Sequence, residues 1–164
     1  MENIKLSIDI VNKFSSYTLA AYFAVLSTMD EQGVSRATYS EIASVLGVGQ
    51  SIKDTITKLV KEGYLNKGKS GAKNVYSYSI PERSYITINR SILDKPLTVK
   101  QLSTLIKLKA NTAIGTNLVG FSGKTLNKMI NFNRDNLTEL LKKGLVKKTE
   151  FGYDLMDDKI FIIN

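Results

Sequence analysis

The sequence contains neither cysteine nor histidine, and each absence excludes a class of chemistry. Without cysteine there is no disulfide framework and no thiol nucleophile, and without either residue there is no Cys/His zinc site and no imidazole base. Long apolar runs are also missing, since the longest, residues 17–26, is too short to span a bilayer. The first eleven residues lack the basic region and apolar stretch of a signal peptide. We therefore expect a cytoplasmic protein with no metal, cofactor or membrane contact.

Positive charge is the main feature of the composition. Lysine and arginine total 23 against 15 for aspartate and glutamate, which gives a net charge of +8 and a pI near 9.5. Hydrophobic residues make up 43% of the chain, which is enough for a packed core. A length of 164 residues permits one compact domain or two modules of about 80 residues each. The chain should fold, and it should prefer polyanions as partners.

Two segments of the chain end in nearly the same nine-residue sequence. Residues 57–65 read TKLVKEGYL and residues 138–146 read TELLKKGLV, and the apolar residues before them keep the same spacing. Each copy follows a long apolar-periodic segment, which itself follows strand-like alternation. These matches predict a repeat divided near residues 81–83, with modules over 1–82 and 83–164. The alternative is that any two amphipathic helices that end in glycine look alike.

Local signals place the elements of the first half. The alternation of Ile4, Leu6, Ile8 and Ile10 predicts a strand, and residues 17–29 are apolar nearly all round, which is typical of a buried helix. A capping box of Thr38 and Glu41 then predicts a helix over 39–46, which is followed by a turn at Gly47 and Gly49. The next helix, over 50–61, ends at Gly63. A hairpin over 64–80 follows, and its tip, 66–74, is basic.

The second half repeats this order. Strand-like residues 85–88 precede a capping box of Thr98 and Gln101 and a helix over 99–110. Helices then follow over 125–130 and 134–143, and short strands over 145–148, 153–156 and 159–163 close the chain. The expected fold class is mainly α with small β-hairpins, an α+β fold of two tandem modules.

Residues 38–65, TYSEIASVLGVGQSIKDTITKLVKEGYL, resemble the core of the winged helix-turn-helix superfamily. The likeness is carried by the apolar residues Ile42, Leu46 and Val48, by the turn glycine and by the L-x-x-x-G-Y-L ending over 59–65. It is weaker in the second half, where Asn131 stands in place of the turn glycine. A tandem pair of such modules is similar both to small plasmid and phage replication initiators and to winged-helix transcription regulators.

The resemblance implies a non-enzymatic protein that binds a specific double-stranded DNA site and acts in transcription regulation or DNA replication. Further partners would be a second copy of the chain, in a homodimer, or the replication or transcription machinery. The location would be nucleoid-associated if the source is bacterial or phage. Two alternatives stay open: a protein-interaction scaffold built on winged helices, and a nonspecific or architectural binder of nucleic acid.

The outward face of the helix over 50–61 supplies the residues that we expect to touch bases. If its apolar stripe is buried, the opposite face turns to the DNA major groove, where base edges carry a distinctive pattern of donors and acceptors. The candidates for base contact are Gln50, Ser51, Asp54 and Thr57. Asp54 is the least favourable candidate, because phosphates repel its carboxylate. A hydrogen bond accepted from a cytosine amino group, or an ion pair with a lysine, would have to compensate for this repulsion.

Cationic residues around this helix and hairpin are candidates for phosphate contacts, because lysine acts as a flexible point charge. The alternative for each is a solvated helix face or a polar loop. The candidates in both halves are Lys53, Lys58, Lys61, Lys67, Lys69, Lys73, Lys124, Lys128 and Arg134.

The second half is more basic but less suited to reading a groove. Residues 84–164 hold 13 basic and 7 acidic residues, net +6, against 10 and 8, net +2, in residues 1–83. The outward face of its last helix carries Asp135 and Glu139, whereas Lys107 and Lys109 count among its basic residues. The hypothesis is that the first half supplies most of the sequence readout and that the second contributes backbone contacts or a protein interface.

Three further patterns are interpreted as structural. The fragment Ser122-Gly-Lys-Thr125 resembles part of a phosphate-binding loop, but Leu118 stands where that motif requires glycine, so a helix start is expected. The acidic residues Asp154, Asp157 and Asp158 are expected in an exposed turn. Tyr76 and Tyr78 are expected to pack against the helix over 50–61, the alternative being stacking on unpaired bases.

Overall fold

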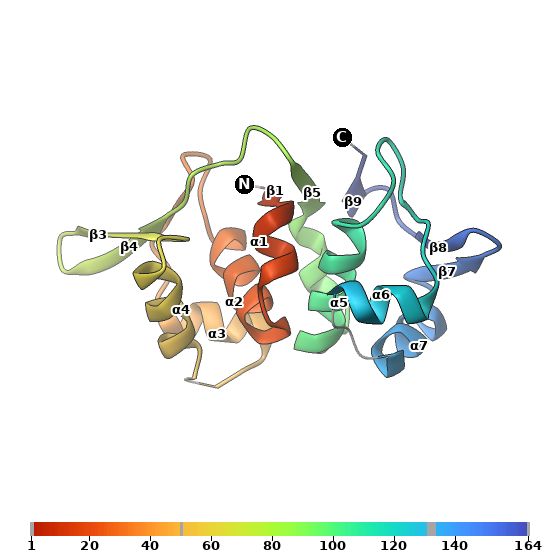
Figure 1. The fold of residues 1–164 in the computed structure, drawn as a ribbon. Coiled ribbons are helices and arrows are strands. Elements are labelled where there is room, and N and C mark those ends of the chain that lie inside the picture. Colours follow the sequence, from red (N-terminus) through yellow and green to blue (C-terminus); the bar gives the residue numbers. More distant parts are fainter. Residues whose placement is uncertain (1, 50, 131–133, 164) are drawn as a thin grey trace.

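A computed structural model describes residues 2–49, 51–130 and 134–163. Helices and small antiparallel sheets make up the fold, as the α+β prediction requires. Figure 1 shows the first half of the chain on the left and the second half on the right, with the β3–β4 and β7–β8 hairpins pointing outward at opposite ends. The two chain ends lie on the same side of the molecule, near β1 and β9.

The first half runs from a strand through four helices to a hairpin. Its elements are β1 (Asn3–Ser7), α1 (Ile8–Lys13), α2 (Ser16–Ser27), β2 (Val34–Ser35), α3 (Tyr39–Leu46), α4 (Ile52–Lys61), β3 (Asn66–Ser70) and β4 (Lys73–Ser77).

The second half follows the same order, with a short 3-10 helix in the place of α1. Its elements are β5 (Tyr85–Asn89), the 3-10 helix η1 (Arg90–Asp94), α5 (Val99–Lys109), β6 (Leu118–Val119), α6 (Gly123–Ile130), α7 (Arg134–Lys142), β7 (Val146–Thr149), β8 (Gly152–Leu155) and the final strand β9 (Phe161–Ile162).

The sheets repeat as well as the helices. Within the described residues, each half has its own three-stranded sheet, ordered β2-β4-β3 in the first and β6-β8-β7 in the second. A third sheet, β1-β5-β9, joins the halves, and its register runs from Asn3 opposite Asn89 to Ser7 opposite Tyr85. The first strands of the two halves therefore pair with each other in antiparallel orientation.

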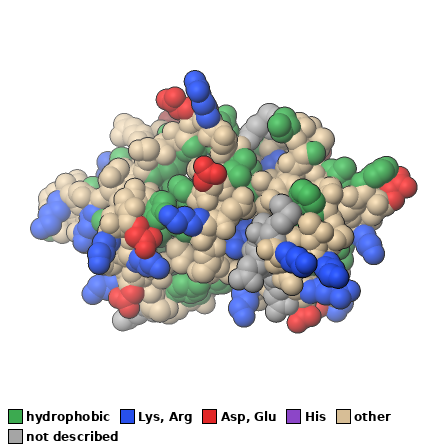
Figure 2. Space-filling view, viewed as in Figure 1, with side chains coloured by type: hydrophobic (Ala, Val, Ile, Leu, Met, Phe, Trp, Pro, Cys, Tyr) green, Lys and Arg blue, Asp and Glu red, His purple; other side chains and the backbone are tan. Residues whose placement is uncertain are grey.

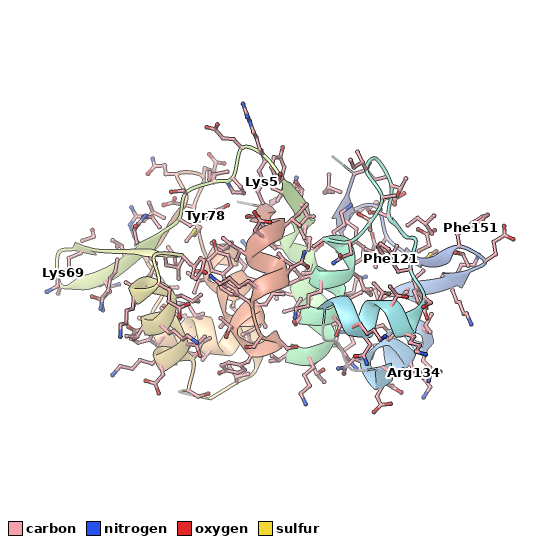
Figure 3. The ribbon with its side chains drawn as sticks, in the orientation of Figure 1. Lys5, Lys69, Tyr78, Phe121, Arg134 and Phe151 are labelled. Carbon is pink, nitrogen blue, oxygen red and sulfur yellow. The ribbon has the colours of Figure 1, made fainter. Side chains whose placement is uncertain are left out.

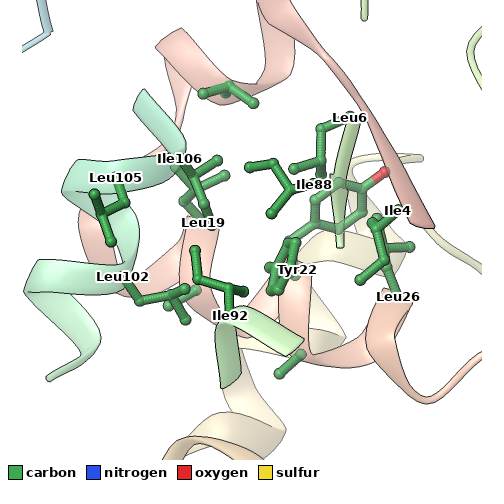
Figure 4. Close-up of a cluster of buried hydrophobic side chains, with 14 of the residues drawn as sticks. Ile4, Leu6, Leu19, Tyr22, Leu26, Ile88, Ile92, Leu102, Leu105 and Ile106 are labelled. Atoms are coloured by element: carbon green, nitrogen blue, oxygen red, sulfur yellow. The ribbon is translucent and has the colours of Figure 1, made fainter. Parts of the chain in front are cut away.

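One hydrophobic core extends through both halves. The equivalent helices α2 and α5 pack against each other. Figure 4 shows that the cluster takes Leu19 and Tyr22 from α2, Leu105 and Ile106 from α5, and Ile88 from β5. The first half on its own would lose β5, the partner strand of β1, and α5, the helix that packs against α2. Functional tests should therefore use the full chain.

The prediction that the alternation from Ile4 to Ile10 forms one strand is wrong beyond Ser7. The strand ends there and the chain forms α1 from Ile8. Ile8, Val11 and Phe14 are spaced three apart, which places them on one helical face, and Val11 and Phe14 are buried in the core. The missed signal was this change of apolar period from two to three.

The capping signals are confirmed at both predicted places. The Thr38 hydroxyl accepts from the backbone N–H of Glu41, whose side chain accepts from the backbone of Thr38, and Thr98 and Gln101 form the same box. Helix α3 has the predicted bounds, and α4 starts at Ile52, two residues later than predicted. Gly47, at φ +62°, turns the chain between these two helices in the left-handed conformation that glycine adopts without strain.

Replacing Thr38 with alanine should lower the free energy of unfolding by about 1 kcal/mol, because the start of α3 loses its hydroxyl acceptor. Urea unfolding followed by far-UV circular dichroism measures this change. Thr57→Ala is the matched control, since Thr57 lies on the exposed face of α4 and caps no helix start. Equal losses for the two variants would contradict a specific role of the cap.

Candidate nucleic-acid interface

Helix α4 is amphipathic in the predicted sense. Ile52, Ile56 and Leu59 are fully buried, and Val60 is half-buried. The opposite face is open to solvent, and because the core fixes the buried stripe, it also fixes which side chains point outward. Of the predicted contact residues, the exposed ones on this helix or at its start are Ser51, Lys53, Asp54, Thr57, Lys58 and Lys61. Gln50 lies outside the described residues.

The two exposed hydroxyls of this region already have partners. Ser51 Oγ lies 2.9 Å from Tyr17 Oη and so links the start of α4 to α2. Thr57 Oγ1 donates to the backbone carbonyl of Lys53 at 2.8 Å, which leaves its lone pairs free to accept. Thr57 therefore keeps a group that can read a base, whereas Ser51 would have to exchange its bond with Tyr17.

The carboxylate of Asp54 is exposed in the first turn of α4. Negative charge is favourable at that end of a helix, because the unpaired backbone N–H groups make it partly positive. Among the described residues, Asp54 has no ion pair with Lys53, Lys58 or any other cation. The predicted ion pair with a neighbouring lysine is therefore absent among the described residues, and the position of Asp54 in the first turn is itself favourable.

The β3–β4 hairpin carries three exposed cations, Lys67, Lys69 and Lys73. None of the three forms an ion pair with another described residue. Tyr76 and Tyr78, at the base of the hairpin, are 2% and 8% exposed, so both are buried, which contradicts stacking on unpaired bases, and the ring of Tyr76 lies beside Tyr39 of α3. The hairpin is thus anchored at one end by buried rings and is positively charged at the other.

Helix α3 and the hairpin are in contact through the rings of Tyr39 and Tyr76. The backbone N–H of Thr38 donates to the Glu41 carboxylate at 2.6 Å and holds the pKa of that carboxyl below its usual value. The positive charge of Lys73 acts in the same direction, and the ring centroids of Tyr39 in α3 and Tyr76 in β4 lie 6.2 Å apart, which places the hairpin beside the start of α3. The α3–turn–α4 unit and the hairpin therefore form one continuous surface.

A hollow of about 610 Å³ opens between α3 and α4. Tyr39, Ser40, Ser44, Gly49 and Lys53 are among its lining residues, so hydroxyls and one cation face the same space. Such a hollow suits a phosphate at the edge of a groove, because hydroxyl and ammonium groups both donate to phosphate oxygens. Sequence reasoning missed Ser40 and Ser44, although both follow the capping residue Thr38 within two turns of helix.

In the second half, the predicted cations of α6 and α7 are exposed. Lys124 and Lys128 extend from α6 and Arg134 from the start of α7, and none of them is in an ion pair with a described residue. Lys142 instead pairs with Glu139 at 2.8 Å, so its charge is partly neutralised.

Lys107 and Lys109 contradict the expectation that they add to the basic surface. Each is 4% exposed on the part of helix α5 that is buried from Gln101 onward, and burial lowers the pKa of both. Lys109 Nζ donates to Asn117 Oδ1 at 2.7 Å, and Asn117 in turn donates to Asp158 and to the carbonyl of Phe161. These lysines are structural. The exposed positive charge of this half is therefore smaller than predicted by two.

The Ser-Gly-Lys-Thr fragment starts a helix, as predicted, but the prediction that Asp154, Asp157 and Asp158 lie in an exposed turn is wrong for Asp154, which is half-buried in a strand. Ser122 Oγ accepts from the backbone N–H of Thr125, so the Ser-Gly-Lys-Thr fragment starts α6. Asp154 lies in β8 and Asp158 is exposed near its end. Within the part of the chain that the structure describes, no group of three acidic residues could hold a metal ion.

Figure 2 shows how the charge is distributed over one face of the molecule. Lys and Arg side chains gather over α4 and the β3–β4 hairpin on the left and over α6 and α7 on the right. The middle of this face also carries charged side chains of both signs. The candidate interface therefore consists of two basic regions at opposite ends of a shared core.

Comparison with protein-family models, with curated proteins and with solved structures found no match to the chain. Among the described helices, none combines the length and the apolar character that crossing a membrane requires.

Proposed function

We propose that this chain is a non-enzymatic, sequence-specific double-stranded DNA-binding protein made of two tandem winged-helix modules. Its role would be that of a transcription regulator or a replication initiator of the plasmid or phage type. Both roles use the same contacts with DNA and differ in what the bound protein recruits.

The repeated order of elements supports the tandem arrangement. In each half, a long helix, a short strand, two further helices and a hairpin follow one another, and the short strand pairs with the second strand of the hairpin. In such a unit the last helix enters the major groove, and the hairpin, or wing, follows the backbone or the adjacent minor groove. Helix α4 and the β3–β4 hairpin would fill these places in the first module.

The observation that carries the proposal is the joint placement of α4 and the basic hairpin. The exposed face of α4 presents Thr57 and Asp54, and the same surface continues to Lys69 and Lys73, neither of which forms an ion pair with a described residue. A surface that combines polar side chains on a projecting helix with unpaired cations at its border suits a duplex, whose base edges lie between phosphate walls.

The proposal divides the work unequally between the modules. The first has the more complete reading surface, whereas the outward face of α7 carries Glu139 paired with Lys142. Lys124, Lys128 and Arg134 would then hold phosphates without selecting a sequence. The affinity would come largely from such contacts, and the specificity from α4.

A salt titration tests duplex binding directly. The full-length protein is added to a fluorescently labelled random-sequence duplex, and anisotropy gives the affinity between about 50 and 200 mM salt. Six or more phosphate contacts should weaken binding about 1,000-fold over this range. Absence of binding at the low-salt end would overturn the proposal in favour of a protein-interaction scaffold.

The Thr57→Ala substitution tests which residues read sequence. We expect it to change the preference among duplexes by about tenfold while nonspecific binding stays the same, because Thr57 would touch a base and no phosphate. Competition between the preferred duplex and its single-base variants measures this ratio. An equal loss on every duplex would remove Thr57 from the reading residues.

A further inference from the structure

The two hairpins occupy equivalent places in the repeat but differ at their tips. The tip of β3–β4 is made of Gly71 and Ala72, with lysines on either side. The tip of β7–β8 carries Phe151, whose side chain is 68% exposed, and Phe121, 37% exposed, precedes the neighbouring helix α6. Figure 3 places Phe151 at the outer end of its hairpin and Lys69 at the outer end of the other. At this exposure, most of the Phe151 ring lies outside the hydrophobic core.

The backbone holds this tip in a fixed position. Gly152, which follows Phe151, has φ +145°, and a Cβ atom there would lie 2.0 Å from the carbonyl oxygen of Val119. Tyr153 pairs with Val119 across β6–β8, and its hydroxyl reaches the start of α6. Only glycine permits this close approach, so the hairpin is docked on the body of the module and Phe151 is displayed from a rigid support.

The charges beside the ring are arranged on both faces of the hairpin. Lys147 and Lys148 are consecutive residues of β7, so their side chains point to opposite faces, and both are exposed. Asp154 lies across the ladder from Lys147, and Glu150 adjoins Phe151 at the tip, so the hairpin as a whole is close to neutral. The tip is therefore an apolar point with Lys148 exposed on one face of the hairpin and Lys147 beside Asp154 on the other, and it is not a general basic patch.

A DNA minor groove fits this arrangement, because a phosphate backbone runs along each of its walls while its floor consists of stacked base pairs. Apolar side chains that enter the minor groove can separate adjacent base pairs and bend the duplex by about 20–90°. A protein partner would fit less well, because the exposed apolar area at the tip is small and is bordered by charge on every side.

We propose, on the basis of the DNA-binding function proposed above, that the β7–β8 hairpin enters the minor groove beside the site and inserts Phe151 between two base pairs. Lys147 and Lys148 contact the phosphates of the two opposite strands, and the duplex bends away from the ring. The first hairpin then serves as an electrostatic clamp and the second as a wedge, which explains why equivalent elements carry such different tips.

The test uses the full-length protein and a duplex of about 40 base pairs that carries the sequence enriched by the wild-type chain from a random library. Donor and acceptor dyes at the two ends report bending by energy transfer, and 2-aminopurine near the site reports unstacking. We expect wild type to bend the duplex and raise the 2-aminopurine signal. Phe151→Ala should lose at least half of the bend and bind about tenfold more weakly, whereas Phe151→Leu should keep most of both effects.

Two matched variants separate the wedge from other effects. Ile114→Ala removes another fully exposed apolar side chain and should change nothing. Glu150→Gln removes the negative charge beside the ring and should tighten binding a few-fold, because that charge would lie near phosphate. If wild type binds no duplex, the proposed function and the wedge fall together. If it binds but Phe151→Ala retains the full bend and affinity, only the wedge is overturned.

Discussion

Replacing Lys69 and Lys73 together with alanine should weaken binding to every duplex by about 10 to 100-fold at low salt. Both side chains are exposed on the β3–β4 hairpin and neither forms an ion pair with a described residue, although Glu41 lies near enough to Lys73 for their charges to interact. Each lost phosphate contact should also reduce the slope of log affinity against log salt by about 0.9, so the double variant should be flatter by nearly two units. Anisotropy titrations at several salt concentrations measure both quantities.

The control for this experiment changes the net charge equally at another place. Arg83 and Lys159 are exposed, lie outside the candidate interface and form no ion pair with a described residue. Arg83→Ala combined with Lys159→Ala should leave the salt slope within a few tenths of the wild-type value. If both double variants lose the same affinity and slope, long-range attraction by net charge would explain binding, and the hairpin would have no local contacts.

Ile106→Ala should lower the free energy of unfolding by about 3 kcal/mol, and it should destabilise both halves of the chain at once. Ile106 is fully buried on α5, in the core that α5 shares with α2, and truncation of such a residue removes apolar contacts and leaves a cavity. Urea unfolding gives the size of the loss. Hydrogen exchange of the backbone amides of α4 and α7 shows whether the protection falls in both halves of the chain.

The matching control is Ile114→Ala, because Ile114 is fully exposed and its truncation should change stability by less than about 0.5 kcal/mol. Faster exchange in α7 with no change in α4 would mean that the halves unfold independently. In that case the core would be two cores in contact, and the isolated first half would become a usable reagent.

Sequence reasoning located the elements whose signals are local. The capping boxes at Thr38 and Thr98 and the left-handed glycines Gly47 and Gly63 depend on neighbours a few residues away, and they placed α3 and the end of α4 correctly. The two-residue strands β2 and β6 escaped detection, because so short an element has no period. The pairing of β1 with β5 also escaped, because its partners lie some 80 residues apart and leave no local pattern.

The candidate site was predictable in its exposure but not in its contacts. The amphipathic stripe of α4 identified Lys53 and Thr57 as exposed, since the period of a helix determines which side chains face the core. The bond between Ser51 and Tyr17 depends on how α4 sits on α2, which the sequence of either helix does not specify. Lys109 was misjudged because burial on α5 is set by packing on several sides, and a lysine can be buried when its ammonium finds an acceptor such as Asn117.

Phe151 shows where a signal was present but was not used. A phenylalanine between an acidic residue and a glycine, in a segment expected to turn, has few core partners within reach. The docking of the tip through Gly152 became apparent only from the approach of its backbone to Val119, which brings together residues 33 positions apart. Contacts of this kind follow from tertiary packing and not from local pattern.

Selection from a random duplex library, with purified full-length protein at physiological salt, tests the central claim most directly. The account predicts enrichment of one defined sequence motif. When the selection is repeated with Thr57→Ala, the base preference at one or more positions of that motif should change. It predicts that the motif itself survives the Lys69→Ala, Lys73→Ala double substitution, although less DNA is recovered. Recovery of no motif by the wild-type protein would contradict sequence-specific recognition.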